Sequence, residues 1–148
     1  MFTEGSILFF DPFYFRNGNT AKAKYFIVLK VMDEKVVLAT LPSSQDYVPA
    51  TVVDADVSPC IEIPDANFNC YFLKAGRIVT TNHWAFPKNT FLYGHQLDEY
   101  EIATLQDIYP IEGIDFEHIG TLSPQVFTEI IACFRKSASV KRKYKKLL

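Results

Sequence analysis

The stretch of sequence that decides the fold runs from Gly5 to Leu41 and reads as a strand, a polar loop and a tight β-hairpin. The strand is Gly5-Ser6-Ile7-Leu8-Phe9-Phe10, a short apolar run of the kind that forms β-structure. A polar loop follows at residues 11–20. The hairpin is predicted by two apolar runs, residues 24–29 and 36–41, and by the polar turn Met32-Asp33-Glu34-Lys35 between them. Because the long first loop returns beside the hairpin, we expect a cleft on a small barrel.

The composition indicates a single folded domain. With 148 residues, of which 49% are hydrophobic and 15% aromatic, the chain can bury a core and is not a disordered polymer. No apolar run approaches the roughly 18 residues that a membrane span needs. The start, Met1-Phe2-Thr3-Glu4, carries an acid and lacks the basic region of a signal peptide. We therefore expect a cytoplasmic protein without membrane contact.

Further short apolar runs follow the hairpin. They lie at residues 60–63, 68–73, 76–81 and 89–94, with turn residues between them. The runs 68–73 and 76–81 are separated only by Lys74-Ala75, which predicts that they pair with each other. Regularly spaced short strands of this kind are typical of a compact, mostly antiparallel barrel.

A helix is predicted near the end of the chain. Ser123 is a good N-cap residue, and Pro124 suits the first helical position. The apolar residues that follow have helical spacing; they are Val126, Phe127, Ile130, Ile131 and Phe134. We expect this stripe to pack against the barrel.

Charge is strongly segregated along the chain. Residues 135–148 hold seven basic residues and no acid, whereas residues 1–134 hold eight basic and 17 acidic residues, a net charge of −9. Seven of those acids lie at 98–117, where no Lys or Arg occurs. We therefore divide the chain into a barrel domain at 1–134, which ends in the helix, and a basic C-terminal tail at 135–148. A solvated, frayed tail is the ordinary interpretation, and the alternatives are nucleic-acid contact or packing on the acidic segment of another copy.

Three cysteines, Cys60, Cys70 and Cys133, show no spacing typical of a metal site. An odd number without clustering favours buried, reduced thiols. A reactive or metal-bound thiol is the alternative.

Several of these residues resemble the MazF/PemK family, the toxins of bacterial toxin–antitoxin pairs. The likeness covers residues 4–45 and, more weakly, 119–134. It consists of the Gly-Ser-Ile-Leu opening strand, Asp11-Pro12 with a Gly/Asn-containing loop, Lys24 before an apolar strand, Thr40-Leu41-Pro42-Ser43-Ser44 after the next strand, and Ile119-Gly120-Thr121-Leu122-Ser123 before the helix.

The resemblance implies a mainly β fold: a small antiparallel Src-homology-3-like barrel of the MazF/PemK/CcdB type with a C-terminal helix. It further implies a metal-independent endoribonuclease that cleaves single-stranded RNA, is usually a homodimer, is paired with an antitoxin protein and needs no cofactor. In the family, an arginine at the start of the second strand and a threonine or serine at the end of the third fill the site. In this chain they fall on Lys24 and on Thr40, or on Ser43 if the register slips.

The lysine at position 24 departs from the family pattern, because arginine grips phosphate with a rigid fork and lysine is a point charge on a flexible stem. Arg16 and Lys22, in the preceding loop, are the candidates to bind RNA phosphates in its place.

A second group of candidate residues lies in the polar loop around His83-Trp84. His83 could serve as an acid or base and Trp84 as a stacking platform for an RNA base. The alternative is a tryptophan tucked over the end of the barrel beside a solvated histidine. The histidines have no zinc-site spacing, and phosphate-cradling and nucleophile-elbow motifs do not occur, so nucleotide-dependent enzymes and triad hydrolases are not expected.

Three functions follow: a ribonuclease, a non-enzymatic barrel that binds a protein, as the gyrase poisons among the family's structural relatives do, and a structural barrel that binds its own second copy. Charge around Lys24 separates the first two. If Arg16, Lys22, Lys24 and the basic tail converge on one cleft, a nuclease is favoured. If acids from 98–117 line that cleft, protein binding is favoured.

Overall fold

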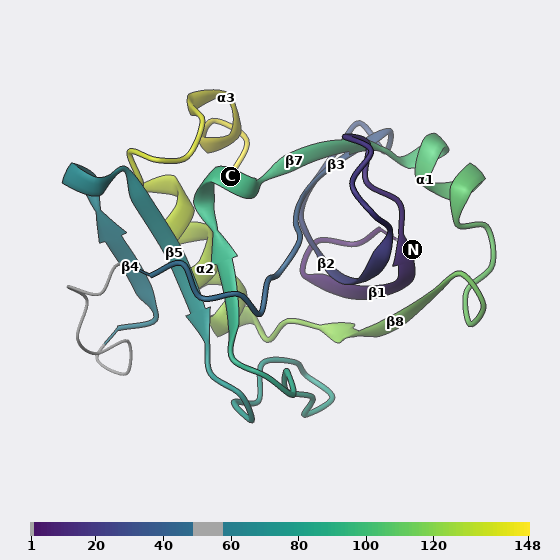
Figure 1. Cartoon of the computed structure of the whole chain (residues 1–148), viewed down its shortest axis with the longest axis horizontal. Coiled ribbons are helices and arrows are strands. Elements are labelled where there is room, and N and C mark those ends of the chain that lie inside the picture. The colour runs from purple at the N-terminus through teal and green to yellow at the C-terminus, as the bar shows by residue number, and fades with distance from the viewer. Residues whose placement is uncertain (1, 49–57) are drawn as a thin grey trace.

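Two antiparallel sheets lie side by side in a computed structural model that describes residues 2–48 and 58–148 (Figure 1). The five-stranded sheet has the order β7-β3-β2-β1-β8 and curls strongly, and the three-stranded sheet has the order β4-β5-β6. The strands are β1 Ser6–Phe13, β2 Lys22–Met32, β3 Val36–Thr40, β4 Cys60–Ile63, β5 Phe68–Leu73, β6 Thr90–Tyr93, β7 Asp98–Glu101 and β8 Phe116–Thr121. The mainly β, antiparallel prediction is confirmed, while the strand pairing of the described residues does not close into a barrel.

Short helices complete the chain. They are the 3₁₀ turns η1 Pro64–Ala66 and η2 Gly94–Gln96, and the helices α1 Ile102–Ile108, α2 Pro124–Arg135 and α3 Arg142–Lys145.

The first loop is shorter than the sequence predicts. After a bulge beyond Phe10, β1 continues to Phe13, which pairs with Lys22 at the start of β2. The loop proper is therefore residues 14–21. The hairpin of β2 and β3 is confirmed, with Ile27 opposite Thr40.

The predicted strand at 76–81 is wrong. β5 pairs with β4 on one side and β6 on the other, so it has no free edge for that segment. The backbone of the segment bonds elsewhere instead: Val79 N–H donates to Trp84 O at 2.9 Å, and Thr81 N–H donates to Thr121 O at 3.0 Å. The segment 76–81 has two adjacent apolar residues, Ile78 and Val79, and this pattern fits a loop whose Val79 is buried as well as it fits a strand.

Both faces of the curled sheet are covered. Alternate residues of a strand point to opposite faces, so Ile7 and Ile27 join a core shared with β5, β6 and α2, while Leu8 and Phe26 join a second core with α1 and β8. This double burial is why residues 7–10 of β1 form a continuous apolar run rather than an alternating one.

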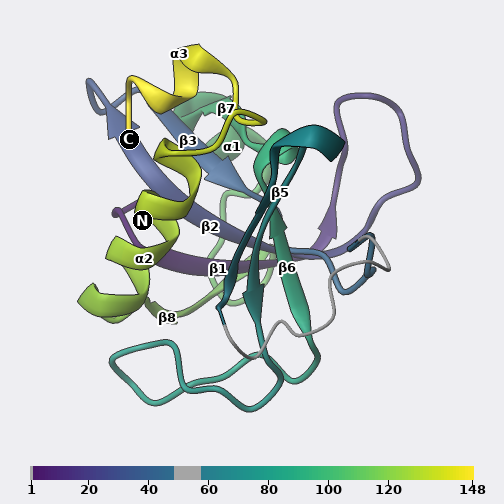
Figure 2. The same cartoon turned by 90° about the vertical axis from the view of Figure 1, so that its left-hand side faces the viewer.

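The predicted helix is confirmed as α2 and lies against β4 and β5 (Figure 2). Val126, Ile130 and Phe134 of the predicted stripe are buried. Ser123 occupies the N-cap position, where its carbonyl accepts from Phe127 N–H at 2.9 Å and its side chain makes no capping bond.

The basic tail is packed rather than frayed. Val140 and Tyr144 are 3% and 2% exposed and belong to the shared core. Glu62 of β4 accepts hydrogen bonds from Ser137 Oγ at 2.8 Å and Ala138 N–H at 2.9 Å. The frayed interpretation is therefore wrong, because the apolar residues within the tail bury against the body. The division at residue 134 stays a prediction.

The prediction of reduced thiols is wrong for two of the three cysteines. Cys60 of β4 and Cys133 of α2 form a disulfide. They are 73 positions apart in the sequence, and packing of α2 on β4 brings them together. Cys70 is the free, buried thiol, and burial raises its pKa to about 12, which makes it unreactive.

Among the described residues, no helix is long and apolar enough to cross a membrane. The cytoplasmic location stays a prediction.

Candidate functional site

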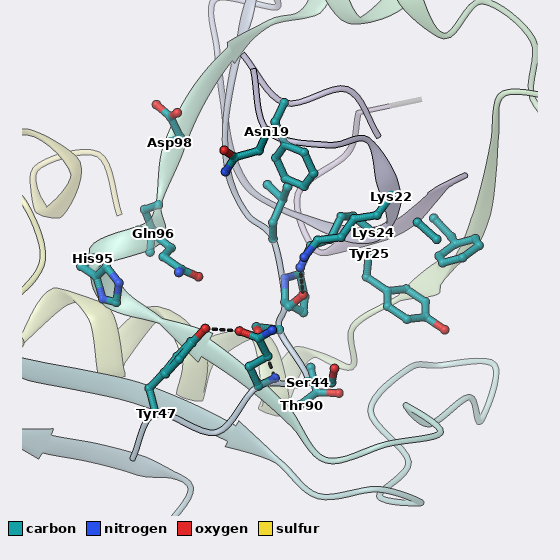
Figure 3. A pocket seen from close by; sticks show the side chains of 18 of the residues that line it. Asn19, Lys22, Lys24, Tyr25, Ser44, Tyr47, Thr90, His95, Gln96 and Asp98 are labelled. Carbon is teal, nitrogen blue, oxygen red and sulfur yellow. Dashed lines mark hydrogen bonds between the residues drawn. The ribbon is translucent and has the colours of Figure 1, made fainter. Parts of the chain in front are cut away.

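A cleft of about 1140 Å³ opens between the first loop, the start of β2, the segment after β3 and the region around η2 (Figure 3). Because these segments are far apart in sequence, only the packing of the two sheets creates it. Its described lining includes Phe9, Phe15, Asn19, Lys22, Lys24, Tyr25, Pro42, Ser43, Ser44, Gln45, Tyr47, Lys88, Thr90, His95, Gln96, Asp98, Tyr100 and Lys141.

Positive charge dominates the cleft. Four lysines line it, from three different segments, whereas Asp98 is the one acid in its described lining. The lysines are Lys22, Lys24, Lys88 and Lys141, the last from the basic tail. This local charge contrasts with the acidic surplus of residues 1–134.

Lys24 lines the cleft and is half-buried. It stands in β2 opposite Phe10, and its Nζ donates to Pro42 O at 2.8 Å (Figure 3). Burial, and secondly the charge of neighbouring Lys22, hold the pKa of Lys24 below its usual value of 10.5. An anion in the cleft would relieve this cost of holding a partly desolvated cation.

Ser43 is positioned by the second sheet. Its N–H donates to Phe91 O at 3.0 Å, and its carbonyl accepts from Phe91 N–H at 2.8 Å, which ties the segment after β3 to β6. The Ser43 hydroxyl lines the cleft and accepts from Gln45 N–H at 3.1 Å.

Thr40 is not brought to the cleft. It is fully buried, and its hydroxyl has no hydrogen-bond partner among the described residues. Of the two positions onto which the family's threonine or serine could fall, the geometry therefore places only Ser43 beside Lys24.

Arg16 lies at the edge of the cleft and is already paired. Its guanidinium forms an ion pair with Asp98 and lies 4.6 Å from the centre of the Tyr100 ring. Tyr144 OH also donates to Asp98, at 3.4 Å, so this carboxylate joins the first loop to the basic tail. Arg16 thus fastens the loop that forms one wall of the cleft.

His83 and Trp84 lie away from the cleft lining. Trp84 is half-buried against Tyr25 and Phe86, with ring centres 5.5 and 4.7 Å away. His83 occupies a turn with a φ of 64° and is exposed. RNA contact by these two residues stays a prediction outside this site.

Sequence reasoning missed Tyr47, His95, Gln96, Lys88 and Lys141 as residues of the cleft. Only His95 has a sequence feature beside it, the preceding Gly94. A Cβ at Gly94 would lie 2.4 Å from Asn69 Oδ1, so η2, which carries His95, needs a glycine there to approach β5. Among the described residues, no group of three His, Cys, Asp or Glu side chains could hold a metal ion.

No protein-family model matches this chain, and no curated protein matches its sequence. The likeness to the MazF/PemK family therefore stays a prediction that rests on the residues quoted above.

Proposed function

We propose that the protein is an endoribonuclease that binds single-stranded RNA in the lysine-lined cleft and cleaves it without a metal ion. The observation that carries this proposal is the convergence of Lys22, Lys24, Lys88 and Lys141 on one cleft with aromatic walls. Lysines neutralise RNA phosphates, and aromatic rings accept unstacked bases, so the combination suits a single strand.

The charge criterion set by the sequence is met in part and supports the same proposal. Lys22, Lys24 and Lys141 of the basic tail line the cleft, Arg16 does not, and Asp98 is the one acid of segment 98–117 in the described lining. Asp98 is itself paired with Arg16. The acidic surplus elsewhere would keep polyanions from binding the rest of the surface and would confine RNA to the cleft.

The chemistry needs few groups. The RNA 2′-oxygen loses its proton to a base and forms a bond to the adjacent phosphorus, while the bond from phosphorus to the 5′-oxygen breaks and that oxygen gains a proton. The products are a 2′,3′-cyclic phosphate and a 5′-hydroxyl end. Lys24, with Ser43 as a hydrogen-bond donor, holds the charge that builds on the phosphate oxygens. His95, the one histidine in the described lining, is the candidate to move protons.

The order of elements supports a relation to the Src-homology-3-like barrels of the MazF/PemK/CcdB type. A first strand, a loop that walls the cleft and a hairpin with the basic residue at its start occur in the expected sequence along β1, β2 and β3. In this proposal the curled five-stranded sheet corresponds to the barrel, and the three-stranded sheet is an addition beside it.

The test is incubation of the purified protein with a long single-stranded RNA in EDTA, followed by mapping of new ends. We expect discrete cuts that end in 2′,3′-cyclic phosphate and that disappear in Lys24→Ala. Lys30→Ala is the matched control, because Lys30 lies in the same strand but outside the cleft. Its Nζ forms an ion pair with Glu4 Oε1 at 3.5 Å. Intact RNA, or cuts that survive in Lys24→Ala, would reject the proposal.

Binding of a protein partner is a second candidate function, favoured by a separate surface. Ile108, Ile111 and Ile114 are 44%, 51% and 74% exposed, and the exposed Tyr14 ring stacks on Tyr109, which follows Ile108 in the chain. These side chains lie in or next to the acidic segment 98–117, which has no basic residue. The partner that fits is a segment with basic and apolar side chains.

A labelled peptide with the sequence of residues 135–148 has this composition and serves as the probe. We expect salt-sensitive binding that is lost when Ile111→Glu and Ile114→Glu are combined. Ile78→Glu is the control, because Ile78 is 54% exposed and lies outside this segment. Absent binding, or equal binding by all three proteins, would remove this candidate.

A further inference from the structure

The cleft has two chemically different sides (Figure 3). Lys22 and Lys24 reach into it from the start of β2, next to Pro42. Tyr47, His95 and Gln96 lie on the other side, from the segment after β3 and from η2. Two lysines on one side, and a tyrosine, a histidine and a glutamine on the other, match the two ends of a nucleotide, its phosphate and its base.

Tyr47 is held in a defined position although it is exposed. The residue is 57% exposed and lines the cleft, yet its backbone N–H donates to Tyr93 OH at 2.8 Å. Tyr93 OH in turn donates to Gln45 O at 2.5 Å, and the Tyr47 hydroxyl donates to Gln45 Oε1. Burial raises the pKa of Tyr93 to about 12, so its hydroxyl remains a donor throughout the neutral range.

Ring contacts support the same arrangement. The Tyr47 ring packs against the buried Tyr93 ring, with ring centres 5.5 Å apart, and the Tyr93 ring lies 5.8 Å from that of His95. Tyr47 therefore presents one supported ring to the cleft. An exposed aromatic ring that is fixed in advance costs little conformational entropy when a base stacks on it.

We propose that Tyr47 is the stacking platform for a nucleobase next to the phosphate held by Lys22 and Lys24, and that Gln96 and His95 contact the edge of that base. This inference rests on the proposed RNA-binding function and adds to it a base-binding subsite. The subsite contributes to RNA affinity and sets the base preference of the cleft. The amide of Gln96 can donate and accept hydrogen bonds, so it can contact the edge of any base and can favour one.

The test uses a 2′-O-methyl RNA oligonucleotide, which cannot be cleaved by attack of the 2′-oxygen, and fluorescence anisotropy. A set of these oligonucleotides carries one abasic position each. For the wild type, we expect one abasic position to weaken binding by about 5- to 150-fold, the range for loss of one stacked base. In Tyr47→Ala, binding of the intact oligonucleotide falls by a similar factor, and that abasic position has no further effect.

Two variants separate stacking from general damage. Tyr47→Phe keeps the ring and is expected to bind like the wild type. Tyr14→Ala removes a ring that is 56% exposed but does not line the cleft, and it is expected to leave affinity unchanged. Thermal unfolding of each variant checks its folding.

The outcomes distinguish this inference from the function on which it rests. If the wild type binds RNA and loses affinity in Lys24→Ala, but Tyr47→Ala binds as tightly as the wild type, the base subsite is rejected and the RNA cleft stands. If the abasic position still weakens binding in Tyr47→Ala by the full factor, the base lies elsewhere and the inference is also rejected. If the wild type binds no RNA, both are rejected.

Discussion

Lys24 is the residue on which the proposed RNA cleft depends most. Its Nζ is partly desolvated, is bonded to Pro42 O at 2.8 Å and lies among three other lysines of the cleft. A phosphate in the cleft gains a charge-assisted hydrogen bond from it, which is worth about 1.5–3 kcal/mol. Lys24→Ala should therefore weaken RNA binding by about 10- to 150-fold.

The dependence of RNA affinity on salt concentration gives a second, independent prediction for Lys24→Ala. Each phosphate contact on a single strand contributes about 0.7 to the slope of log affinity against log salt concentration, so four lysines predict a slope of magnitude about 3 for the wild type. Lys24→Ala should reduce this magnitude by about 0.7, whereas Lys24→Arg keeps the charge and should keep the slope. Anisotropy with a 2′-O-methyl oligonucleotide at several salt concentrations measures both quantities.

Lys30→Ala controls for the loss of any one positive charge from β2. Thermal unfolding controls for folding, because Lys24→Ala removes a half-buried cation but also leaves Pro42 O without its donor. A Lys24→Ala protein that folds, binds RNA like the wild type and shows an unchanged salt slope would refute the assignment of the phosphate site.

Three further predictions concern pH, the disulfide and the packing of η2. Because Lys24 has a lowered pKa and binds phosphate when protonated, RNA affinity should fall as pH rises through a range below 10.5, and the anisotropy titration of Lys24→Arg should lack that step. The disulfide closes a loop of 73 positions, and the loss of chain entropy in the unfolded state is then worth about 4 kcal/mol. Reduction should therefore lower the free energy of unfolding, measured in urea, by up to that amount. Titration of three free thiols in the untreated, unfolded protein would contradict the Cys60–Cys133 bond. Gly94→Ala would place a Cβ 2.4 Å from Asn69 Oδ1 and should destabilise the fold by about 1–3 kcal/mol; an unchanged urea midpoint would show that this contact relaxes without cost.

Where a structural feature depends on neighbouring residues, the sequence predicted it well. The hairpin of β2 and β3 needed only its apolar runs and a polar turn, and β4 and β5 were found at their predicted residues, 60–63 and 68–73. The strand prediction for 76–81 was wrong because strand pairing there depends on distant residues. The local pattern of this segment suited a strand, but β5 had already been paired on both edges by β4 and β6.

Within the candidate site, the sequence predicted Lys22, Lys24 and Ser43, which lie near the two strands of the hairpin and line the cleft. It did not predict Tyr47, His95 or Lys141, because no local pattern marks a residue that lines a cleft formed by distant segments. Thr40 shows the same limit. A shift of one residue in strand register moves a side chain from the core face to the surface face, and the Thr40 side chain lies on the core face.

The sequence by itself determined which segments are apolar, because the apolar runs of the strands and the helical spacing of Val126, Ile130 and Phe134 are local properties of the chain. The tertiary structure alone decided which faces meet. It bonded Cys60 to Cys133, buried Val140 and Tyr144 of the basic tail, and brought Lys88 and Lys141 into one cleft with the two lysines at the start of β2. The physical reason is that an apolar face lowers the free energy of the folded chain when it packs on any other apolar face of suitable shape. Which faces pair is decided only by the close packing of the whole core.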